Sequence, residues 1–394
     1  MTSNISRRAG RHFLQIPGPS PVPDRVLRAM DMPVLDHRGP EFQKLGMRVL
    51  EKLRGVFRTS GHVFIYPASG TGAWEAALSN LLSPGDKILM YETGHFATLW
   101  KNMAVKFGLE PEFIATDWRR GLDPARIEQR LREDTGHALK AVCVVHNETS
   151  NGTTSRIDEV RKAVDAAGHP ALLLVDTVSG LGCVDYRHEE WGVDVSVAAS
   201  QKGMMLPPGI SFNAVSEKAL AASREAKRPK LFWSWEEMIP HNNNGYFPYT
   251  PATNMLYGLD AAIDMLHEEG LENVFARHIR HGEATRRAVA AWGLETLCLE
   301  ASQHSPVLTG VLLPDGHDAD RLRQIVLENF DMSLGIGLGK LAGKAFRIGH
   351  LGDTNDLTLM GALSGVEMGL ALAGAPHRPG GVAAAMEHLR STLR

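Results

Sequence analysis

The sequence has few cysteines and no long apolar run. Its three cysteines, Cys143, Cys183 and Cys298, are an odd number without CxxC spacing, which argues against a disulfide framework or a thiolate metal site. No segment approaches the roughly 18 consecutive apolar residues that a membrane span needs, and the N-terminus MTSNISRRAGRHF lacks the apolar core of a secretion signal. We therefore expect a cytoplasmic protein that does not contact a membrane.

The sequence also lacks an excess of one charge sign. Its 42 basic and 45 acidic side chains give a formal net charge of −3, so no basic field is available to hold nucleic acid. The 17 histidines show no metal-ligand spacing, and we expect no metal site. A length of 394 residues is sufficient for two domains.

The chain alternates between strand-like and helical patterns. Prolines at 17, 19, 21 and 23 predict an extended N-terminal arm that crosses another surface, and apolar residues at helical spacing predict a helix over 42–57. Helical segments at 72–82 and 157–167 separate short apolar runs at 63–67, 87–91, 141–146, 171–176 and 194–200. This alternation predicts an α/β fold with a mostly parallel sheet, whose ligand lies beyond the carboxyl ends of the strands.

The pattern changes after a long helical stretch at 252–269. The remainder predicts helices at 274–292 and 320–330, strands at 307–314 and 346–350, and a glycine-rich turn at 335–339. We therefore expect an N-terminal arm at 1–20, a large domain at 21–269 and a smaller α+β domain at 270–394.

Three features could carry chemistry, and each also has a purely structural interpretation. The turn Ser69-Gly70-Thr71 precedes a helix and can hold a phosphate, although such turns are often glycine-rich for steric reasons alone. Asp176 ends an apolar run and is either a structural hydrogen-bonding group or the counter-ion of a cationic ligand. Lys202 follows a later run and is either a surface lysine or a desolvated, nucleophilic amine.

Together these features are the parts that hold pyridoxal phosphate by its phosphate, its pyridine nitrogen and its aldehyde carbon. The sequence resembles the class V (fold type I) pyridoxal-phosphate aminotransferases, in particular the serine–glyoxylate and alanine–glyoxylate group. The blocks that carry this resemblance occur in order along nearly the whole chain: FLQIPGPSPVP, LDHRGPEF, FIYPASGTGAWEAALSN, VVHNETSNG, HPALLLVDTVSG, EWGVDVSVAASQKGMMLPPG, GYFPYTP and KAFRIGHLGD.

The resemblance implies a large domain with a seven-stranded type of sheet, a smaller C-terminal domain and pyridoxal 5′-phosphate as cofactor. It implies that Lys202 bonds to the cofactor and moves the substrate proton, while Asp176 keeps the pyridine nitrogen protonated. Phe96 matches an aromatic ring stacked on the cofactor, its alternative being an ordinary core residue. Further matches to cofactor-binding positions are Ser69, Gly70, Thr71, Thr149, Val178, Gln201 and Thr250.

Substrate recognition follows from the same resemblance. Arg347 matches the arginine that binds the substrate carboxylate, a task that suits a planar guanidinium. His37 and Arg38 match a loop that reaches an active site and contacts the donor side chain, their alternative being a surface loop of ion pairs. Thr250 matches a phosphate contact from the neighbouring subunit, so the resemblance implies a homodimer with shared active sites, or a higher oligomer built from it.

The substrates implied by the resemblance are small amino acids and 2-oxo acids. The expected reaction moves the amino group of L-serine to glyoxylate and gives glycine and hydroxypyruvate. Aspartate or alanine as donor, and pyruvate as acceptor, stay open because Thr177-Val178-Ser179-Gly180 departs from the sequence of close relatives. Cysteine desulfuration is disfavoured, because Cys143 and Cys183 lie in or just after strand-like runs and Cys298 lies far along the small domain.

Overall fold

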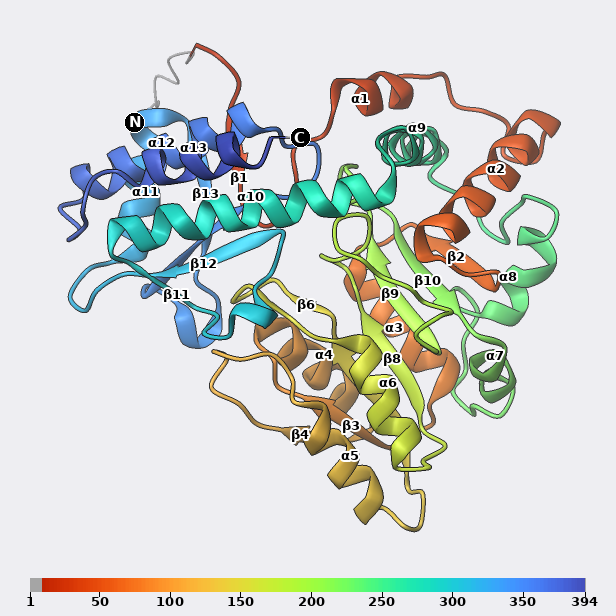
Figure 1. The fold of residues 1–394 in the computed structure, drawn as a ribbon. Helices are drawn as coiled ribbons and strands as arrows, with labels where there is room; N and C mark the ends of the chain where they lie inside the picture. Colours follow the sequence, from red (N-terminus) through yellow and green to blue (C-terminus); the bar gives the residue numbers. More distant parts are fainter. Residues whose placement is uncertain (1–8, 394) are drawn as a thin grey trace, which may run out of the picture.

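The computed structural model of the protein describes residues 9–393 and contains two large β-sheets, each packed against helices (Figure 1). The first eight residues of the expected N-terminal arm, and Arg394, lie outside the described residues. Within the described chain, no helix combines the length and the apolar composition that a membrane span requires.

The larger sheet has seven strands in the order β2-β10-β9-β8-β5-β3-β4. Only β10 runs against its neighbours, so the sheet is mostly parallel and the predicted α/β class is confirmed. The predicted apolar runs all became strands, whereas β4 and β10 were missed: Glu110 and Glu112 break the apolar pattern of β4, and Ser211 and Asn213 break that of β10. The strands are β2 (His62–Tyr66), β3 (Lys87–Tyr91), β4 (Glu110–Ile114), β5 (Leu139–Val145), β8 (Leu172–Asp176), β9 (Val195–Ala199) and β10 (Ser211–Val215).

Helices pack around this sheet and share one apolar core with it. In α2 (Pro40–Phe57), Phe42, Leu45, Val49 and Leu53 recur every three or four residues and are all buried, as the spacing predicted. The remaining helices of this part are α1 (Asp24–Met30), α3 (Gly70–Leu81), α4 (His95–Lys106), α5 (Pro124–Glu133), α6 (Ile157–Ala166), α7 (Glu217–Ser223), α8 (Trp235–Asn242) and α9 (Thr253–Glu269).

The smaller sheet has five strands in the order β1-β13-β14-β12-β11 and a separate apolar core that includes Trp292 and Phe346. Its strands are β1 (Phe13–Gln15), β11 (Glu295–Thr296), β12 (Leu308–Leu312), β13 (Met332–Ile336) and β14 (Ala345–Gly349). Its helices are α10 (Leu271–Trp292), α11 (Ala319–Phe330), α12 (Asp356–Leu372) and α13 (Gly381–Ser391). The glycine-rich segment 335–339 is not wholly a turn, because Gly335 belongs to β13 and pairs with Arg347.

The N-terminal arm connects the two sheets. Its strand β1 pairs in parallel with β13, placing Phe13 opposite Met332. The chain then passes over the turn that follows β9: the Ser20 amide donates to the Gln201 carbonyl at 2.9 Å, and the Ser20 hydroxyl donates to the Lys202 carbonyl at 2.8 Å. The extended, proline-rich arm thus crosses another surface, as its composition predicted.

Candidate active site

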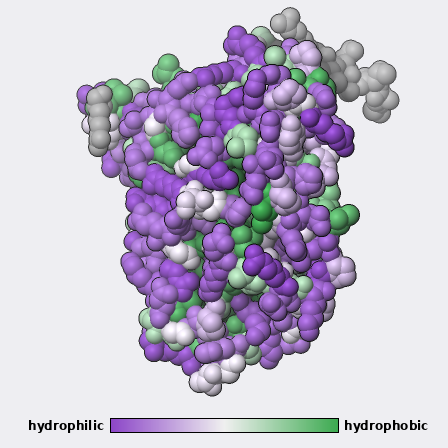
Figure 2. All heavy atoms as spheres, turned by 90° about the vertical axis from the view of Figure 1, so that its right-hand side faces the viewer, coloured by the Kyte–Doolittle hydropathy of each residue, from purple (hydrophilic) through white to green (hydrophobic). Residues whose placement is uncertain are grey.

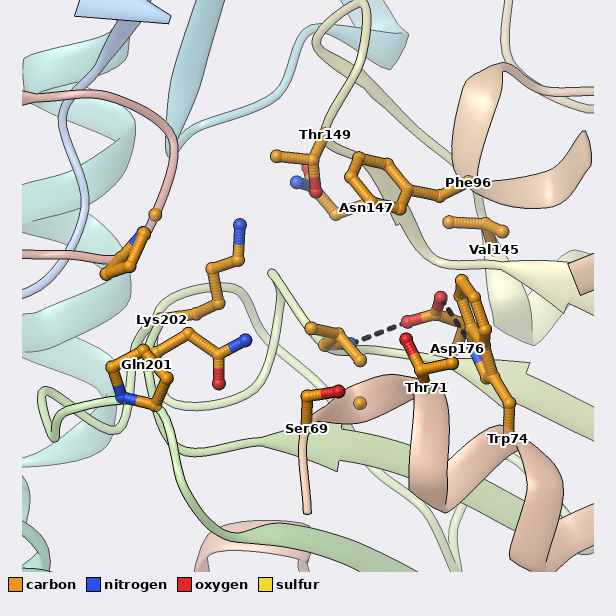
Figure 3. Close-up of a pocket in the computed structure, with 15 residues that line it drawn as sticks. Ser69, Thr71, Trp74, Phe96, Val145, Asn147, Thr149, Asp176, Gln201 and Lys202 are labelled. Atoms are coloured by element: carbon orange, nitrogen blue, oxygen red, sulfur yellow. Dashed lines mark hydrogen bonds between the residues drawn. The ribbon is translucent and has the colours of Figure 1, made fainter. Parts of the chain in front are cut away.

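A cavity of about 250 Å³ lies where the carboxyl ends of the large sheet meet the N-terminal arm (Figure 3). Every residue predicted to bind the cofactor lines it except Thr250. The lining consists of Gly18, Pro19, Ser69, Gly70, Thr71, Trp74, Phe96, Val145, Asn147, Thr149, Asp176, Val178, Gln201, Lys202 and Pro208.

Lys202 lies in the turn after β9 and is only 7% exposed, so its interpretation as a surface lysine is wrong. Its Nζ donates to the Pro17 carbonyl of the arm. Burial, together with the nearby Arg347 cation, lowers the pKa of Lys202 to about 7, although Asp176 and Glu148 oppose the shift. A large fraction of the amine is therefore neutral and nucleophilic near neutral pH.

Gly18 is required where the arm passes Lys202. Its φ of +102° lies in the region that favours glycine, and a Cβ there would lie 2.2 Å from Lys202 Cδ. No side chain fits between the arm and the lysine. The sequence analysis placed Gly18 in the arm, but nothing in the local pattern indicated this contact.

Asp176 is the last residue of β8, is 3% exposed and faces the cavity (Figure 3). Its Oδ2 accepts a hydrogen bond from Trp74 Nε1 at 3.0 Å, and its Oδ1 accepts one from the Val178 amide at 2.8 Å. Burial raises the pKa of Asp176 to about 7, opposed by the Val178 bond, and Glu148 adds to the rise. A cationic ring nitrogen in the cavity would relieve this unfavourable burial of a carboxylate.

Trp74 is a site residue that the sequence analysis missed. It lies one turn into α3, lines the cavity and stacks on Trp100 with ring centroids 5.8 Å apart. The available signal was a tryptophan one helical turn after the Ser69-Gly70-Thr71 motif, on the same face of the helix. Its indole N–H fixes the orientation of the Asp176 carboxylate.

The turn at Ser69 places the beginning of α3 at the cavity. Ser69 occupies the N-cap position but its side chain caps nothing, so the first amides of α3 point toward the cavity as in sites that bind anions. A Cβ on Gly70 would lie 2.8 Å from Val178 Cγ2, which explains the glycine sterically. The side-chain oxygen of Gln201 is buried without a hydrogen-bond partner. The free amides of α3 are donors and fit the phosphate of pyridoxal phosphate, whereas the Gln201 oxygen is an acceptor and would need a donor from another group.

Thr149 and Asn147 line the opposite side of the cavity and are held by a single hydroxyl. Thr149 Oγ1 and Asn147 Nδ2 each donate to Ser179 Oγ at 2.8 Å. The Phe96 ring lies beside them at the cavity (Figure 3), is partly buried and also packs against the core of the large domain, so its role on the cofactor stays a prediction.

Arg347 approaches from the smaller sheet. It is the middle residue of β14 and pairs with Gly310 and Gly335, and a Cβ on Gly335 would lie 2.9 Å from Arg347 Cβ, so this glycine leaves space for the arginine. Its Nε donates to the Ile336 carbonyl at 2.8 Å and its Nη1 to the Thr149 carbonyl at 2.7 Å. Burial lowers the pKa of Arg347 to about 10, so the guanidinium stays charged at neutral pH. Arg347 thus places a cation next to the cavity wall.

The structure does not bring His37, Arg38 or Thr250 to the cavity of the same chain. His37 is half-buried, whereas Arg38 and Thr250 are exposed. The Arg38 amide donates to Asp36 Oδ1 at 3.0 Å, which is a local turn contact. The resemblance placed Thr250 at a neighbouring subunit's site and His37 and Arg38 on a loop reaching one, so their roles stay predictions.

An α/β fold with a buried lysine, a buried aspartate and a phosphate-binding turn around one cavity defines a pyridoxal-phosphate-dependent enzyme. The model of the family described as aminotransferase class-V matches residues 12–333. The chain belongs to this family, and it is an aminotransferase whose cofactor is pyridoxal phosphate.

Relatives of the chain match over almost their whole length. The serine–glyoxylate aminotransferase of Methylorubrum extorquens is 48% identical over 98% of both chains. The L-aspartate–glyoxylate aminotransferase of Paracoccus denitrificans is 44% identical over 96% of both. Among solved structures, the pyridoxamine–pyruvate aminotransferase of Mesorhizobium loti has a TM-score of 0.91 and 29% identity, covering 98% of this chain and all of that one.

Proposed function

We propose that this aminotransferase moves the amino group of L-serine to glyoxylate and gives glycine and hydroxypyruvate. The observation that carries the proposal is that Lys202 and Asp176 line one cavity while Arg347, which does not line it, contacts its wall at Thr149, in a chain 48% identical to a serine–glyoxylate aminotransferase. When bound, pyridoxal phosphate supplies an aldehyde that takes up amino groups and a ring that accepts electrons from the substrate Cα–H bond.

The residues of the large domain bind and orient the cofactor. The amides at the beginning of α3 and the side chains of Ser69 and Thr71 hold the phosphate, with Gln201 beside them. Asp176 would pair with a protonated ring nitrogen of the cofactor, and the Phe96 ring would contact its pyridine ring. Thr149 and Val178 complete the contacts with the ring.

Lys202 has two tasks in this proposal. Its amine, neutral in large part because its pKa is near 7, would bond to the aldehyde carbon of the cofactor and would hold the proton removed from the substrate Cα. The arm excludes water from this amine, since Gly18 and Pro17 lie directly against it.

Arg347 binds the carboxylate that every donor and acceptor carries. Its Nε and Nη1 are oriented by two backbone carbonyls from different domains. Among the hydrogen bonds of residues 9–393, none uses Nη2, which is therefore free to donate to a carboxylate. One arginine thus serves both halves of the reaction.

Aspartate is the second candidate donor because the Paracoccus denitrificans relative, at 44% identity, is named for it. A donor with a second carboxylate needs a second cation, and His37 and Arg38 are the residues predicted for this contact. The Nε2 of His37 is buried without a partner, so a hydrogen-bonding group is missing from its surroundings in the single chain.

The purified holoenzyme distinguishes these donors. Serine, alanine and aspartate are added separately, and the loss of the cofactor's aldehyde absorbance is followed as a single half-reaction. We expect serine to react with the highest second-order rate constant and glyoxylate to regenerate the aldehyde form. Regeneration by 2-oxoglutarate or pyruvate but not by glyoxylate would overturn the acceptor, and faster reaction of aspartate would overturn the donor.

We further propose a homodimer in which His37, Arg38 and Thr250 complete the site of the other subunit. Figure 2 shows apolar side chains along the middle of the face beside α2 and α8, and Val34 and Leu231 are about three-quarters exposed. Sedimentation at enzyme concentrations used for assays should give a dimer or a larger assembly; an active monomer would contradict the proposal.

The division into an arm at 1–20, a large domain at 21–269 and a small domain at 270–394 is part of the same proposal. It is supported by two separate apolar cores, one spanning residues 26–274 and the other residues 284–389. The free cysteines Cys143, Cys183 and Cys298 support a cytoplasmic location.

A further inference from the structure

Glu148 is a buried carboxylate beside the cavity that the proposed mechanism does not use. It ends β6 (Asn147–Glu148), which pairs with β7 (Thr153–Thr154), and it lies between Asn147 and Thr149 in the cavity wall. Its exposure is 1%, and none of the ion pairs of residues 9–393 includes it. A buried carboxylate without an ion pair is costly unless other groups compensate for it.

The compensating groups are hydrogen-bond donors: the Ser150 amide donates to Oε1 at 3.0 Å, the Thr93 hydroxyl donates to Oε2 at 3.4 Å, and the first amides of α4 also donate. The amides of Phe96 and Ala97 donate to Glu148 Oε1 and Oε2, each at 3.3 Å. The positive end of the helix dipole also favours a negative charge at this point. Gly94, the N-cap residue, has no side chain that could cap the helix, so Glu148 replaces the missing cap from a segment about fifty residues away.

Ser150 connects the same two segments. Its hydroxyl donates to Glu148 Oε1 at 2.7 Å and accepts from the His95 amide at 3.0 Å. A Cβ on Gly94 would lie 2.4 Å from Ser150 Oγ and 2.5 Å from Glu148 Cγ, so only glycine permits this approach. The beginning of α4 is therefore fixed to the wall that carries Thr149.

Phe96 is the residue that this connection positions at the cavity. Its backbone amide is bound by Glu148, while its ring extends toward Thr149 and Asn147 (Figure 3). Because the ring is only partly buried, side-chain packing alone does not fix it. The hydrogen bond to the Glu148 carboxylate therefore fixes the position of the Phe96 backbone from which the ring extends.

We propose that Glu148 is a positioning residue: by capping α4 it fixes the Phe96 ring against the face of the bound cofactor. This inference rests on the proposed use of the cavity for pyridoxal phosphate. It predicts that removing the second carboxylate oxygen loosens the cofactor only when Phe96 is present. In Glu148→Gln, an NH₂ group replaces the carboxylate oxygen that accepts from the Ala97 amide. The two N–H donors then face each other, and this hydrogen bond is lost.

The test is a double-mutant cycle on the holoenzyme with Glu148→Gln, Phe96→Leu and the double variant. The readouts are the rate of cofactor release into a competing apoenzyme and the circular dichroism of the cofactor band per bound cofactor. Glu148→Gln should release the cofactor about tenfold faster and weaken the circular dichroism in the presence of Phe96. In the Phe96→Leu background, it should change the release rate by less than about twofold.

A matched control exists in the small domain. Glu367 caps α13 in the same way, accepting from the Gly380 amide at 2.7 Å and the Val382 amide at 2.9 Å. Glu367→Gln removes an equivalent cap far from Phe96, so it should lower the melting temperature without changing cofactor release. Glu148→Gln behaving like Glu367→Gln, or accelerating release equally in both backgrounds, would overturn the inference.

A variant that does not fold and a wild-type protein that binds no cofactor have different consequences. If Glu148→Gln does not fold, Ser150→Ala weakens the same connection and takes its place in the double-mutant cycle. Ser150→Ala should accelerate cofactor release about two- to threefold when Phe96 is present. An additive cycle would again refute the inference. A wild-type protein that binds no pyridoxal phosphate at all would contradict the proposed function itself, a result distinct from an additive cycle in variants that do bind it.

Discussion

The seven-stranded sheet contributes to the cavity through residues at or just after the carboxyl ends of its strands, whereas the five-stranded sheet places Arg347 against the cavity wall from the middle of β14. The two contributions also differ in electrostatics. Burial brings the pKa of Asp176 and of Lys202 to about 7, but leaves Arg347, with a pKa of about 10, a cation. Groups that exchange charge with the cofactor and substrate thus lie on one sheet, and the group that holds the carboxylate lies on the other.

The largest effect is expected when the Lys202 amine is removed from the large-sheet side of the cavity. Lys202→Ala should reduce turnover by about 10⁴-fold, because no other described amine lines the cavity to accept the Cα proton. Single-turnover absorbance with serine measures this loss. The control Lys218→Ala removes a half-exposed lysine on α7 and should keep full activity. A Lys202→Ala enzyme within tenfold of wild type would show that the proton goes elsewhere.

A smaller effect is expected on the other sheet. Arg347→Lys keeps the charge but loses the free Nη2 donor and the two carbonyl contacts that orient it, so kcat/KM for serine and for glyoxylate should each fall by about 10²-fold. Steady-state kinetics with each substrate varied in turn provides the measurement. Arg323→Lys is the matched control, since Arg323 also donates to a backbone carbonyl of β13, at Leu334. A loss confined to one substrate would mean that Arg347 does not bind both.

Trp74→Phe tests how the indole hydrogen bond affects the Asp176 carboxylate. Without the indole N–H the pKa of Asp176 should rise further, so the acidic limb of the pH–rate profile should move to higher pH, and kcat/KM should fall about tenfold. Trp100→Phe is the control, because Trp100 is equally buried and stacks on Trp74 but its Nε1 has no partner. An identical shift in both variants would assign the effect to packing.

The smallest effect concerns the stability of the cofactor-free protein. The folded-state pKa of Asp176, about 7, lies above the ordinary 3.8, so between these values the folded protein keeps a proton that the unfolded chain has lost. The free energy of unfolding of the wild type should therefore fall relative to that of Asp176→Asn as the pH rises from about 4 to 7. Above about pH 7 the difference between the two proteins should stay constant. Melting temperatures should record a relative change of about 2 °C or more; a difference independent of pH would contradict the shift.

The same comparison shows which parts of the molecule can be predicted from sequence. Asp176 and Lys202 were predictable because Asp176 ends one apolar run and Lys202 lies two residues after another, and parallel strands bring their carboxyl ends to one edge. The pairing of β1 with β13, residues more than 300 positions apart, has no local signal. Trp74 and Glu148 were missed for a related reason: their partners, Asp176 and the amides of α4, become neighbours only in the folded chain.

Arg347 falls between these cases. Its role came from the family resemblance, while nothing local showed that Gly310 and Gly335 would flank it or that Ile336 and Thr149 would orient it. The glycine-rich segment looked like a turn because strand propensity disfavours glycine, yet Gly335 lies in a strand where the neighbouring arginine needs space.

The central claim is that Lys202 is the amine through which this chain binds pyridoxal phosphate. Reduction of the purified holoenzyme with borohydride, followed by peptide mapping, tests it directly. The account predicts one stable cofactor adduct, on the peptide that contains Lys202, and none in Lys202→Ala. An adduct on another lysine, or a wild-type protein without any adduct, would contradict it.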